Sequence, residues 1–118
     1  MEKECIFCKI MKGEIKSDVF YESENFIVIK DIHPISQGHS LIISKKHYEN
    51  VLDLPNLLGN EIFSVIKDVF FKLQKETNCE GFNVVQNNFS AAGQVINHIH
   101  FHIIPRKKND GVNLINGL

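Results

Sequence analysis

Three histidines, His98, His100 and His102, alternate with apolar residues near the end of the chain. Successive side chains of a β-strand point to opposite faces, so this spacing places the three imidazoles on one face and the apolar residues between them on the other. Residues two apart on a strand lie roughly 6.5–7 Å apart at Cα, so two or three imidazoles can serve one ligand. Imidazole acts as nucleophile, acid, base or metal ligand near neutral pH. The pattern therefore predicts a reaction centre on this strand.

Two kinds of site fit such a strand. A catalytic zinc ion commonly takes three protein ligands and keeps one position open, which the three histidines could supply. A nucleophilic histidine instead needs a nearby phosphorus and donors that hold the phosphate. The preceding loop, residues 87–94, is rich in Asn, Ser, Ala and Gly, and offers polar side chains and backbone N–H groups that a phosphate can approach closely. This loop favours the nucleophilic histidine.

A second candidate metal site lies near the N-terminus, where Cys5 and Cys8 form a Cys-x-x-Cys motif. This motif is typical of zinc binding or of thiol redox chemistry. A redox motif is expected after a strand, and no strand is predicted before Cys5, which favours zinc. Cys79 has no evident partner in the sequence and is predicted to be a small core or edge residue.

Composition excludes several classes of partner. The 118 residues include 13 basic and 14 acidic side chains, well mixed along the chain, and the formal charge is −1. Such a balance favours neither nucleic acid nor an anionic membrane, and a small polar ligand fits better. The charged N-terminus lacks a long apolar run, so we expect neither a signal peptide nor a membrane span. Three cysteines, an odd number, argue against a disulfide framework, and we expect a cytoplasmic protein.

Hydrophobic periodicity predicts the elements that position these residues. Apolar residues at three- and four-residue steps after Pro55 predict one long helix that ends at about Thr77, and residues 5–12 predict a short helix closed by Gly13. Apolar and β-branched runs predict strands at residues 19–22, 26–29, 39–43, 81–85 and 97–105. About five strands with hairpin-type connections and two helices predict one α+β domain over residues 1–118, with a mostly antiparallel sheet.

The region around the histidines is similar to the signature of the histidine triad nucleotide-binding proteins. From Gly93 to Arg106, histidines alternate with apolar residues after a Gly-Gln pair. Further segments match the bacterial Hint-like branch of that family in the same order: residues 5–10, 30–34, 38–43, 81–83 and 86–88. The resemblance is close to full length. It implies a HIT-like fold and a homodimer.

The resemblance implies catalytic roles for three histidines. His100, the middle one of the run, corresponds to the nucleophile, which attacks the α-phosphorus of a nucleotide and becomes transiently nucleotidylated. Its second ring nitrogen would donate to a backbone carbonyl of the same strand. His102 and His39 correspond to residues that bind or polarise the phosphate and help the leaving group depart. Related nucleotidyltransferases have glutamine in place of His102, and this difference favours hydrolysis over transfer to a second phosphate.

The resemblance also implies a nucleotide-binding surface. Asp31 corresponds to a carboxylate that accepts hydrogen bonds from both ribose hydroxyls, and Asn87 and Gln94 correspond to phosphate and ribose contacts. Val95 replaces a hydroxyl residue that many relatives have, which removes a side-chain donor to phosphate but keeps the backbone amide; Phe89 stands where the loop often has glycine. The apolar walls of a purine pocket, which ordinary core packing would equally explain, correspond to Ile6, Phe7, Ile10, Ile29 and Ile32.

A structural zinc ion is implied as well. In the bacterial branch that carries both cysteines, zinc joins them to two histidines, which here correspond to His47 and His98. Two sulfur and two nitrogen ligands suit tetrahedral zinc, and a closed site of this kind contributes to folding rather than to chemistry. His98 would then be structural and His100 catalytic, with no catalytic metal.

Together these features predict a small cytoplasmic hydrolase of purine nucleoside phosphoramidates with an AMP-like ligand. Two alternatives stay open. A dinucleoside polyphosphate hydrolase of the Fhit-like branch would use the same nucleophile on a different leaving group. A nucleotide-binding or scaffold protein would hydrolyse nucleotides only incidentally, although intact His39, His100 and His102 argue against an inactive enzyme.

Overall fold

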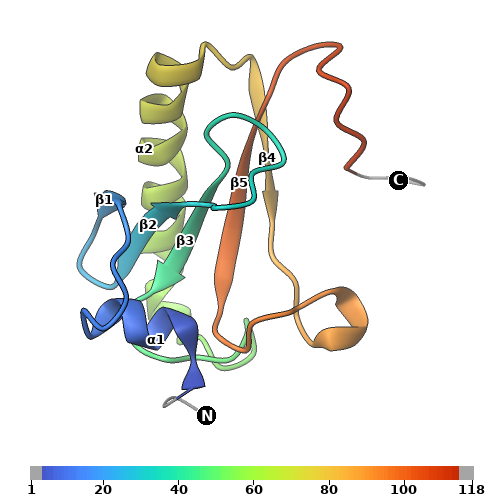
Figure 1. The fold of residues 1–118 in the computed structure, drawn as a ribbon. Coiled ribbons are helices and arrows are strands. Elements are labelled where there is room, and N and C mark those ends of the chain that lie inside the picture. The colour runs from blue at the N-terminus through green and yellow to red at the C-terminus, as the bar shows by residue number, and fades with distance from the viewer. Residues whose placement is uncertain (1–3, 115–118) are drawn as a thin grey trace.

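Five antiparallel strands form one sheet in the computed structural model, which describes residues 4–114 (Figure 1). The strand order is β1-β2-β3-β5-β4. The strands are β1 (Val19–Glu22), β2 (Phe26–Lys30), β3 (Ser40–Ser44), β4 (Gly81–Val85) and β5 (His100–Arg106); the helices are α1 (Ile6–Met11), α2 (Gly59–Thr77) and the short 3₁₀ turns η2 (Asn56–Leu58) and η3 (Ser90–Ala92). The predicted α+β architecture is confirmed.

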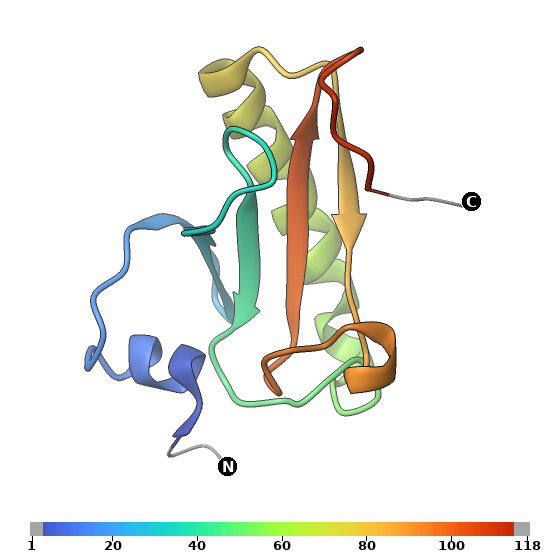
Figure 2. The same cartoon turned by 45° about the vertical axis from the view of Figure 1, so that its right-hand side comes forward.

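The long helix α2 covers one face of the sheet (Figure 1, Figure 2). Its buried apolar residues follow the predicted three- and four-residue spacing: Ile62, Val65, Val69 and Leu73. They pack against the sheet residues Phe26, Val28, Ile42 and Ile103. Burial of each such side chain stabilises the fold by about 1.5–3 kcal/mol, so this layer holds the sheet together. None of the helices within residues 4–114 could span a lipid bilayer.

The other face of the sheet is partly covered by α1. An apolar cluster joins the N-terminal helix to β2 and β3 through Cys5, Phe7, Cys8, Ile27, Ile29, Leu41 and Ile43. In the ladder between β3 and β5, His100 lies opposite Ile43 and His102 lies opposite Leu41. Opposite residues of a ladder share a face, so the two imidazoles lie on the α1 side of the sheet.

The last strand begins at His100, so the prediction of three histidines on one strand is wrong for His98. That residue lies in a bend before β5, and its side chain is fully buried. The N–H of Ile99 donates to the carbonyl of Tyr48 at 2.7 Å, beyond the end of β3. Because β3 ends at Ser44, the ladder ends at His100 and the chain turns away before it.

The strand predicted to begin at His39 begins at Ser40, which leaves His39 in the turn before β3. Gly38 in this turn has φ +88°, and a Cβ there would lie 3.0 Å from Thr77 and 3.1 Å from Leu73 of α2. Only glycine allows both this backbone conformation and this close approach. Gly38 therefore sets the position of His39 relative to α2.

Candidate functional site

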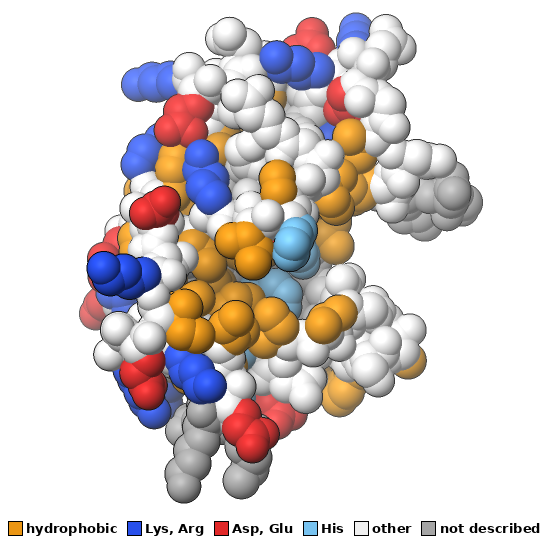
Figure 3. Space-filling model, viewed as in Figure 1, with side chains coloured by type: hydrophobic (Ala, Val, Ile, Leu, Met, Phe, Trp, Pro, Cys, Tyr) orange, Lys and Arg blue, Asp and Glu red, His pale blue; other side chains and the backbone are white. Residues whose placement is uncertain are grey.

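Histidine side chains lie at the bottom of a hollow on the α1 side of the molecule, bordered by apolar side chains (Figure 3). The rings of His100 and His102 have centroids 5.2 Å apart, and those of His102 and His39 are also 5.2 Å apart. The structure thus brings together the three histidines that were expected to be catalytic. His39 reaches them from the turn before β3, and the other two come from β5.

His100 is held by its own main chain. Its Nδ1–H donates to the carbonyl oxygen of His98 at 2.8 Å, which leaves the lone pair of the neutral ring on Nε2. The ring of Phe7 contacts it edge-on, with centroids 5.1 Å apart. Burial lowers the pKa of His100, although that carbonyl and Asp31 act in the opposite direction. A neutral imidazole with its lone pair on Nε2 can act as a nucleophile.

His39, His102 and Asp31 form a polar group beside His100. Nε2 of His39 lies 2.9 Å from Nδ1 of His102 and 3.4 Å from Oδ2 of Asp31. The N–H of Ile35 donates to Nδ1 of His39 at 3.0 Å. Burial lowers the pKa of His39, and burial with the neighbouring imidazoles lowers the pKa of His102 to about 4. Both rings are therefore neutral near pH 7.

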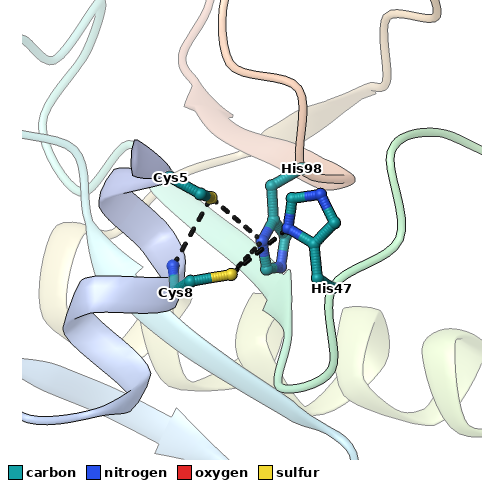
Figure 4. A group of neighbouring side chains, drawn as sticks. All are labelled: Cys5, Cys8, His47 and His98. Carbon is teal, nitrogen blue, oxygen red and sulfur yellow. Dashed lines mark hydrogen bonds between the residues drawn. The ribbon is translucent and has the colours of Figure 1, made fainter. Parts of the chain in front are cut away.

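Cys5, Cys8, His47 and His98 converge in a second cluster (Figure 4). Sγ of Cys5 lies 3.3 Å from Nδ1 of His98, and Sγ of Cys8 lies 3.2 Å from Nδ1 of His47 and 3.6 Å from Nδ1 of His98. In tetrahedral zinc sites with bonds of about 2.0–2.3 Å, neighbouring ligand atoms are roughly 3.3–3.8 Å apart. The four donor atoms have the chemistry and nearly the spacing of a closed zinc site.

The surroundings of this cluster also fit a metal. Nε2 of His98 lies 2.8 Å from the carbonyl oxygen of Ser44 and 3.1 Å from its hydroxyl. Donation to that carbonyl places the ring proton on Nε2 and directs the Nδ1 lone pair toward the two sulfurs, and carbonyl groups orient zinc-binding histidines in the same way. The N–H of Cys8 donates to Sγ of Cys5 at 3.5 Å, so the main chain of α1 helps to orient this sulfur. The cluster therefore suggests a structural zinc ion.

Asp31 follows β2 and lines an open cavity of about 600 Å³. Its Oδ1 accepts from the N–H of His33 at 2.9 Å, so one oxygen is oriented by the backbone and the other faces His39. Ile32 lines the same cavity and is 84% exposed. An apolar residue exposed beside a carboxylate suits a nucleoside, whose base is flat and whose ribose is polar.

The other residues expected to wall a purine have different surroundings. Ile6 is 43% exposed and lines a separate cavity of about 250 Å³ together with Val95, which is 90% exposed. The remaining three pack in the apolar cluster beneath α1: Phe7, Ile10 and Ile29. For these three, core packing accounts for the apolar side chain without a ligand.

The side chain of Gln94 is hydrogen-bonded within the loop between β4 and β5. It is 6% exposed, and its Oε1 accepts from the N–H of Phe89 at 2.7 Å. Its Nε2 donates to the carbonyls of Glu49 at 2.6 Å and Ile96 at 3.1 Å, which commits both amide protons. In this structure both protons are directed into the loop, and the expected phosphate contact stays a prediction. Asn87, also expected to bind the nucleotide, lies near Gly93 in the same loop.

The main-chain partner of His100 was expected from the resemblance, but sequence reasoning missed two others. The carbonyl of Ser44 orients His98, and the N–H of Ile35 orients His39. Every residue carries these groups, so no residue type marks them in a sequence. Only the strand and turn geometry brings them to the histidine rings.

Comparison with known proteins assigns the family. Residues 12–109 match the HIT domain. The chain belongs to the HIT family. An uncharacterized HIT-like protein of Methanocaldococcus jannaschii is 45% identical over 109 residues, which cover 91% of this chain and 82% of the relative. The family that the histidine run and the Cys-x-x-Cys motif resemble is thus confirmed as the family of this chain.

Two further HIT relatives bear on the sites. An adenosine 5'-monophosphoramidase of Candida albicans is 42% identical over 107 residues, covering 87% of this chain and 70% of that enzyme. The crystal structure of a Zn-bound histidine triad family protein from Mycobacterium smegmatis has a TM-score of 0.89 at 31% identity, covering 97% of this chain and 83% of that one. The HIT-like fold is thus confirmed, and the family includes a nucleotide hydrolase.

Proposed function

We propose that this HIT-family chain hydrolyses purine nucleoside phosphoramidates at the α-phosphate through a nucleotidyl-His100 intermediate. The hydrogen bond from Nδ1 of His100 to the carbonyl of His98, 2.8 Å long, is the observation that carries the proposal. This hydrogen bond places the ring proton on Nδ1, so the Nε2 lone pair is available to attack phosphorus. The activity named for the Candida albicans relative supports the choice of substrate class.

The proposed reaction has two steps. Nε2 of His100 attacks the α-phosphorus while the bond from phosphorus to the leaving nitrogen breaks, and that nitrogen keeps the electron pair and gains a proton. Water then attacks the same phosphorus, the bond to His100 breaks, and the proton of the water is released. The products are AMP and an amine. His39 and His102 would bind the phosphate, and Asp31 would accept from the ribose hydroxyls.

The second cluster would hold the proposed structural zinc ion through Cys5, Cys8, His47 and His98. When bound, zinc supplies folding free energy by joining the start of α1 to the segments after β3 and before β5. No proton or phosphoryl group passes through this site in the proposed reaction. Cysteine ligands of this kind also fit the reducing cytoplasm.

We further propose that the protein is a homodimer. Among the described strands, β4 is an edge of the sheet, and unpaired edges can pair with an identical strand of a second copy. Phe70 of α2 stacks on Phe82 of β4, with centroids 4.4 Å apart, and its neighbour Phe71 is 60% exposed. An apolar surface continuous with a sheet edge favours a second copy as its partner.

Replacement of His100 tests the proposed function. We expect His100→Ala to abolish turnover of adenosine phosphoramidate while AMP still binds, because the attacking imidazole is lost and the proposed contacts to ribose and phosphate remain. Rapid acid quenching of the wild type should trap an adenylylated protein, detectable by mass spectrometry, and His100→Ala should not form it. His33→Ala, which removes an exposed histidine outside both clusters, is the matched control. Activity that persists in His100→Ala would disprove covalent catalysis.

Substrate comparison tests the leaving group. Adenosine phosphoramidate and a diadenosine polyphosphate would be compared by kcat/KM with the same preparation. Faster turnover of the phosphoramidate supports the proposal, and faster turnover of the dinucleotide supports the Fhit-like alternative. A protein that binds AMP but turns over neither substrate would be a binding or scaffold protein.

A further inference from the structure

Phe89, in the loop between β4 and β5, has a backbone conformation that residues with side chains rarely adopt. Its φ is 71° and its ψ is 155°. This combination lies in a region that essentially only glycine occupies, because a Cβ there crowds the neighbouring peptide groups. Phe89 therefore carries backbone strain that a glycine at the same position would not have.

Hydrogen bonds of the main chain hold Phe89 in this conformation. Its N–H donates to Oε1 of the buried Gln94 at 2.7 Å. Its carbonyl oxygen accepts from the N–H groups of Ala92 and Gln94, both at 3.1 Å. The preceding residue, Asn88, joins the loop to the segment after β3, because its Oδ1 accepts from the N–H of Val51 at 2.9 Å. None of these bonds uses the phenyl ring, so glycine at position 89 would form them equally well.

Packing does not account for the phenyl ring either. Phe89 is 56% exposed, and among the described residues it belongs to neither of the two apolar clusters on the faces of the sheet. A single exposed apolar side chain is ordinary at a protein surface. An exposed side chain that also strains the backbone lowers stability without a gain from burial, and strain of this kind is concentrated at ligand-binding and catalytic sites. The ring is therefore a candidate contact for a ligand.

The strand order places Phe89 on the side of the histidines away from Asp31. Strand β5, which carries His100 and His102, lies between β3 and β4, whereas Asp31 follows β2 on the other side of β3. Val85, the last residue of β4, lies opposite His102, so the antiparallel chain beyond it runs toward the level of His100. In both ribbon views the start of β5 lies between α1 and η3, the turn that begins directly after Phe89 (Figure 1, Figure 2).

This placement separates the two ends of a substrate. With its ribose at Asp31 and its α-phosphorus at His100, a nucleotide would occupy the β2 side of the histidines. The β4 side, where Phe89 lies, is then left for the group that departs from phosphorus. Hydrophobic side chains border the hollow on that side as well (Figure 3).

We propose that Phe89 is a specificity-determining residue whose ring contacts a planar, apolar part of the leaving group. Aromatic rings pack favourably against other planar rings, stacked or edge-on. The planar part belongs either to an amine that carries an aromatic ring or to the second base of a dinucleotide. The inference rests on the proposed function, because it needs a substrate with its phosphorus at His100.

Two pairs of substrates test this contact. The first pair is the adenosine 5'-phosphoramidates of 2-phenylethylamine and hexylamine, two amines of similar basicity that differ in the aromatic ring. The second pair is diadenosine triphosphate and ATP, which differ in the second nucleoside. For one pair, the wild type should prefer the compound with the additional ring by about fivefold in kcat/KM, and Phe89→Ala should lose this preference. Phe63→Ala, which removes an exposed ring from α2, should keep the wild-type ratio.

The outcomes separate the two sources of the ring. A ratio that falls in Phe89→Ala for the phosphoramidates identifies an aromatic amine, and a fall confined to the second pair identifies a second base. Ratios that are the same in the wild type and in Phe89→Ala for both pairs would overturn the inference. Absence of turnover of all four compounds in the wild type would contradict the proposed function, and the affinities of the uncleaved compounds would then supply the same ratios.

Thermal unfolding tests the strain without any substrate. Phe89→Gly and Phe89→Ala both lack the ring, but only glycine adopts the observed backbone freely. We expect the Tm of Phe89→Gly to be about 5 °C higher than that of Phe89→Ala. Equal Tm values would remove the strain from which the role of the ring is inferred.

Discussion

The carbonyl oxygen of His98 accepts the hydrogen bond from Nδ1 of His100 at 2.8 Å, while Nδ1 of the His98 ring lies 3.3 Å from the sulfur of Cys5 and 3.6 Å from that of Cys8. One residue therefore belongs to both sites: its side chain to the proposed zinc site, and its main chain to the candidate nucleophile. The metal site would hold the carbonyl that orients His100. Stability and activity should depend on the same cluster.

Loss of a zinc ligand should therefore reduce both the stability of the fold and the activity. We expect about one zinc ion per chain in the wild type, and Cys8→Ser should lose it, because a closed site needs its four ligands. The lost binding free energy should lower stability by about 3 kcal/mol or more, a fall in Tm of roughly 10 °C. Metal analysis and thermal unfolding measure these changes. Cys79→Ala, outside the cluster, is the control, and full zinc content in Cys8→Ser would contradict the assignment.

Gly38→Ala should be strongly destabilising. The backbone at φ +88° disfavours a side chain, and the new Cβ would lie about 3 Å from Leu73 and Thr77. Strain and overpacking together should cost about 2–4 kcal/mol in the free energy of unfolding, measured by urea denaturation. Gly59→Ala, in α2 with open space around it, should instead stabilise by up to about 1 kcal/mol. Equal stabilities of the two variants would contradict this account.

Gln94→Glu should destabilise the loop between β4 and β5. A carboxylate can still accept from the N–H of Phe89, but it cannot donate to the carbonyls of Glu49 and Ile96. These two carbonyl oxygens would then face a carboxylate oxygen with no hydrogen between them. The expected loss is about 1–3 kcal/mol in the free energy of unfolding. Gln37→Glu, at an exposed glutamine, should be neutral. A raised KM with unchanged stability would instead support the phosphate contact predicted from sequence.

Acid should destabilise the protein through His102. Its pKa is about 4 in the folded state and near 6.5 in the unfolded chain, so the unfolded state binds more protons between these values. The contribution of His102 to the free energy of unfolding is therefore fully present above about pH 6.5, and it is lost as the pH falls toward 4. Urea denaturation at pH 7 and pH 5 should show a larger loss in the wild type than in His102→Gln. The zinc ligands are the same in both proteins, so equal losses would disprove this role of His102.

The proposed dimer can be tested at Phe71. Light scattering should give the mass of two chains for the wild type and a shift to one chain for Phe71→Glu, because a charge there would be buried against the second copy. Leu57, 92% exposed on η2, provides the control Leu57→Glu. A wild type that has the mass of one chain at micromolar concentration would contradict the proposal.

Local patterns were enough to predict much of this protein. The three- and four-residue spacing gave α2, the apolar runs gave the five strands, and alternation placed His100 and His102 on one face. These signals depend on helix and strand geometry, which each segment carries within itself. The Cys-x-x-Cys motif marked a candidate metal site in the same way, and the family resemblance supplied the two histidines that lie beside it in the structure.

The surroundings of each histidine depend on contacts between segments far apart in the chain. His98 leaves the strand because Ile99 bonds to Tyr48 after β3 has ended, and His39 receives its tautomer from a turn held by β5 and α2. Gln94, expected at the phosphate, orders its loop because two carbonyls lie within reach of its amide. Main-chain donors and acceptors are identical in every residue, so their pairing follows from the folded geometry alone.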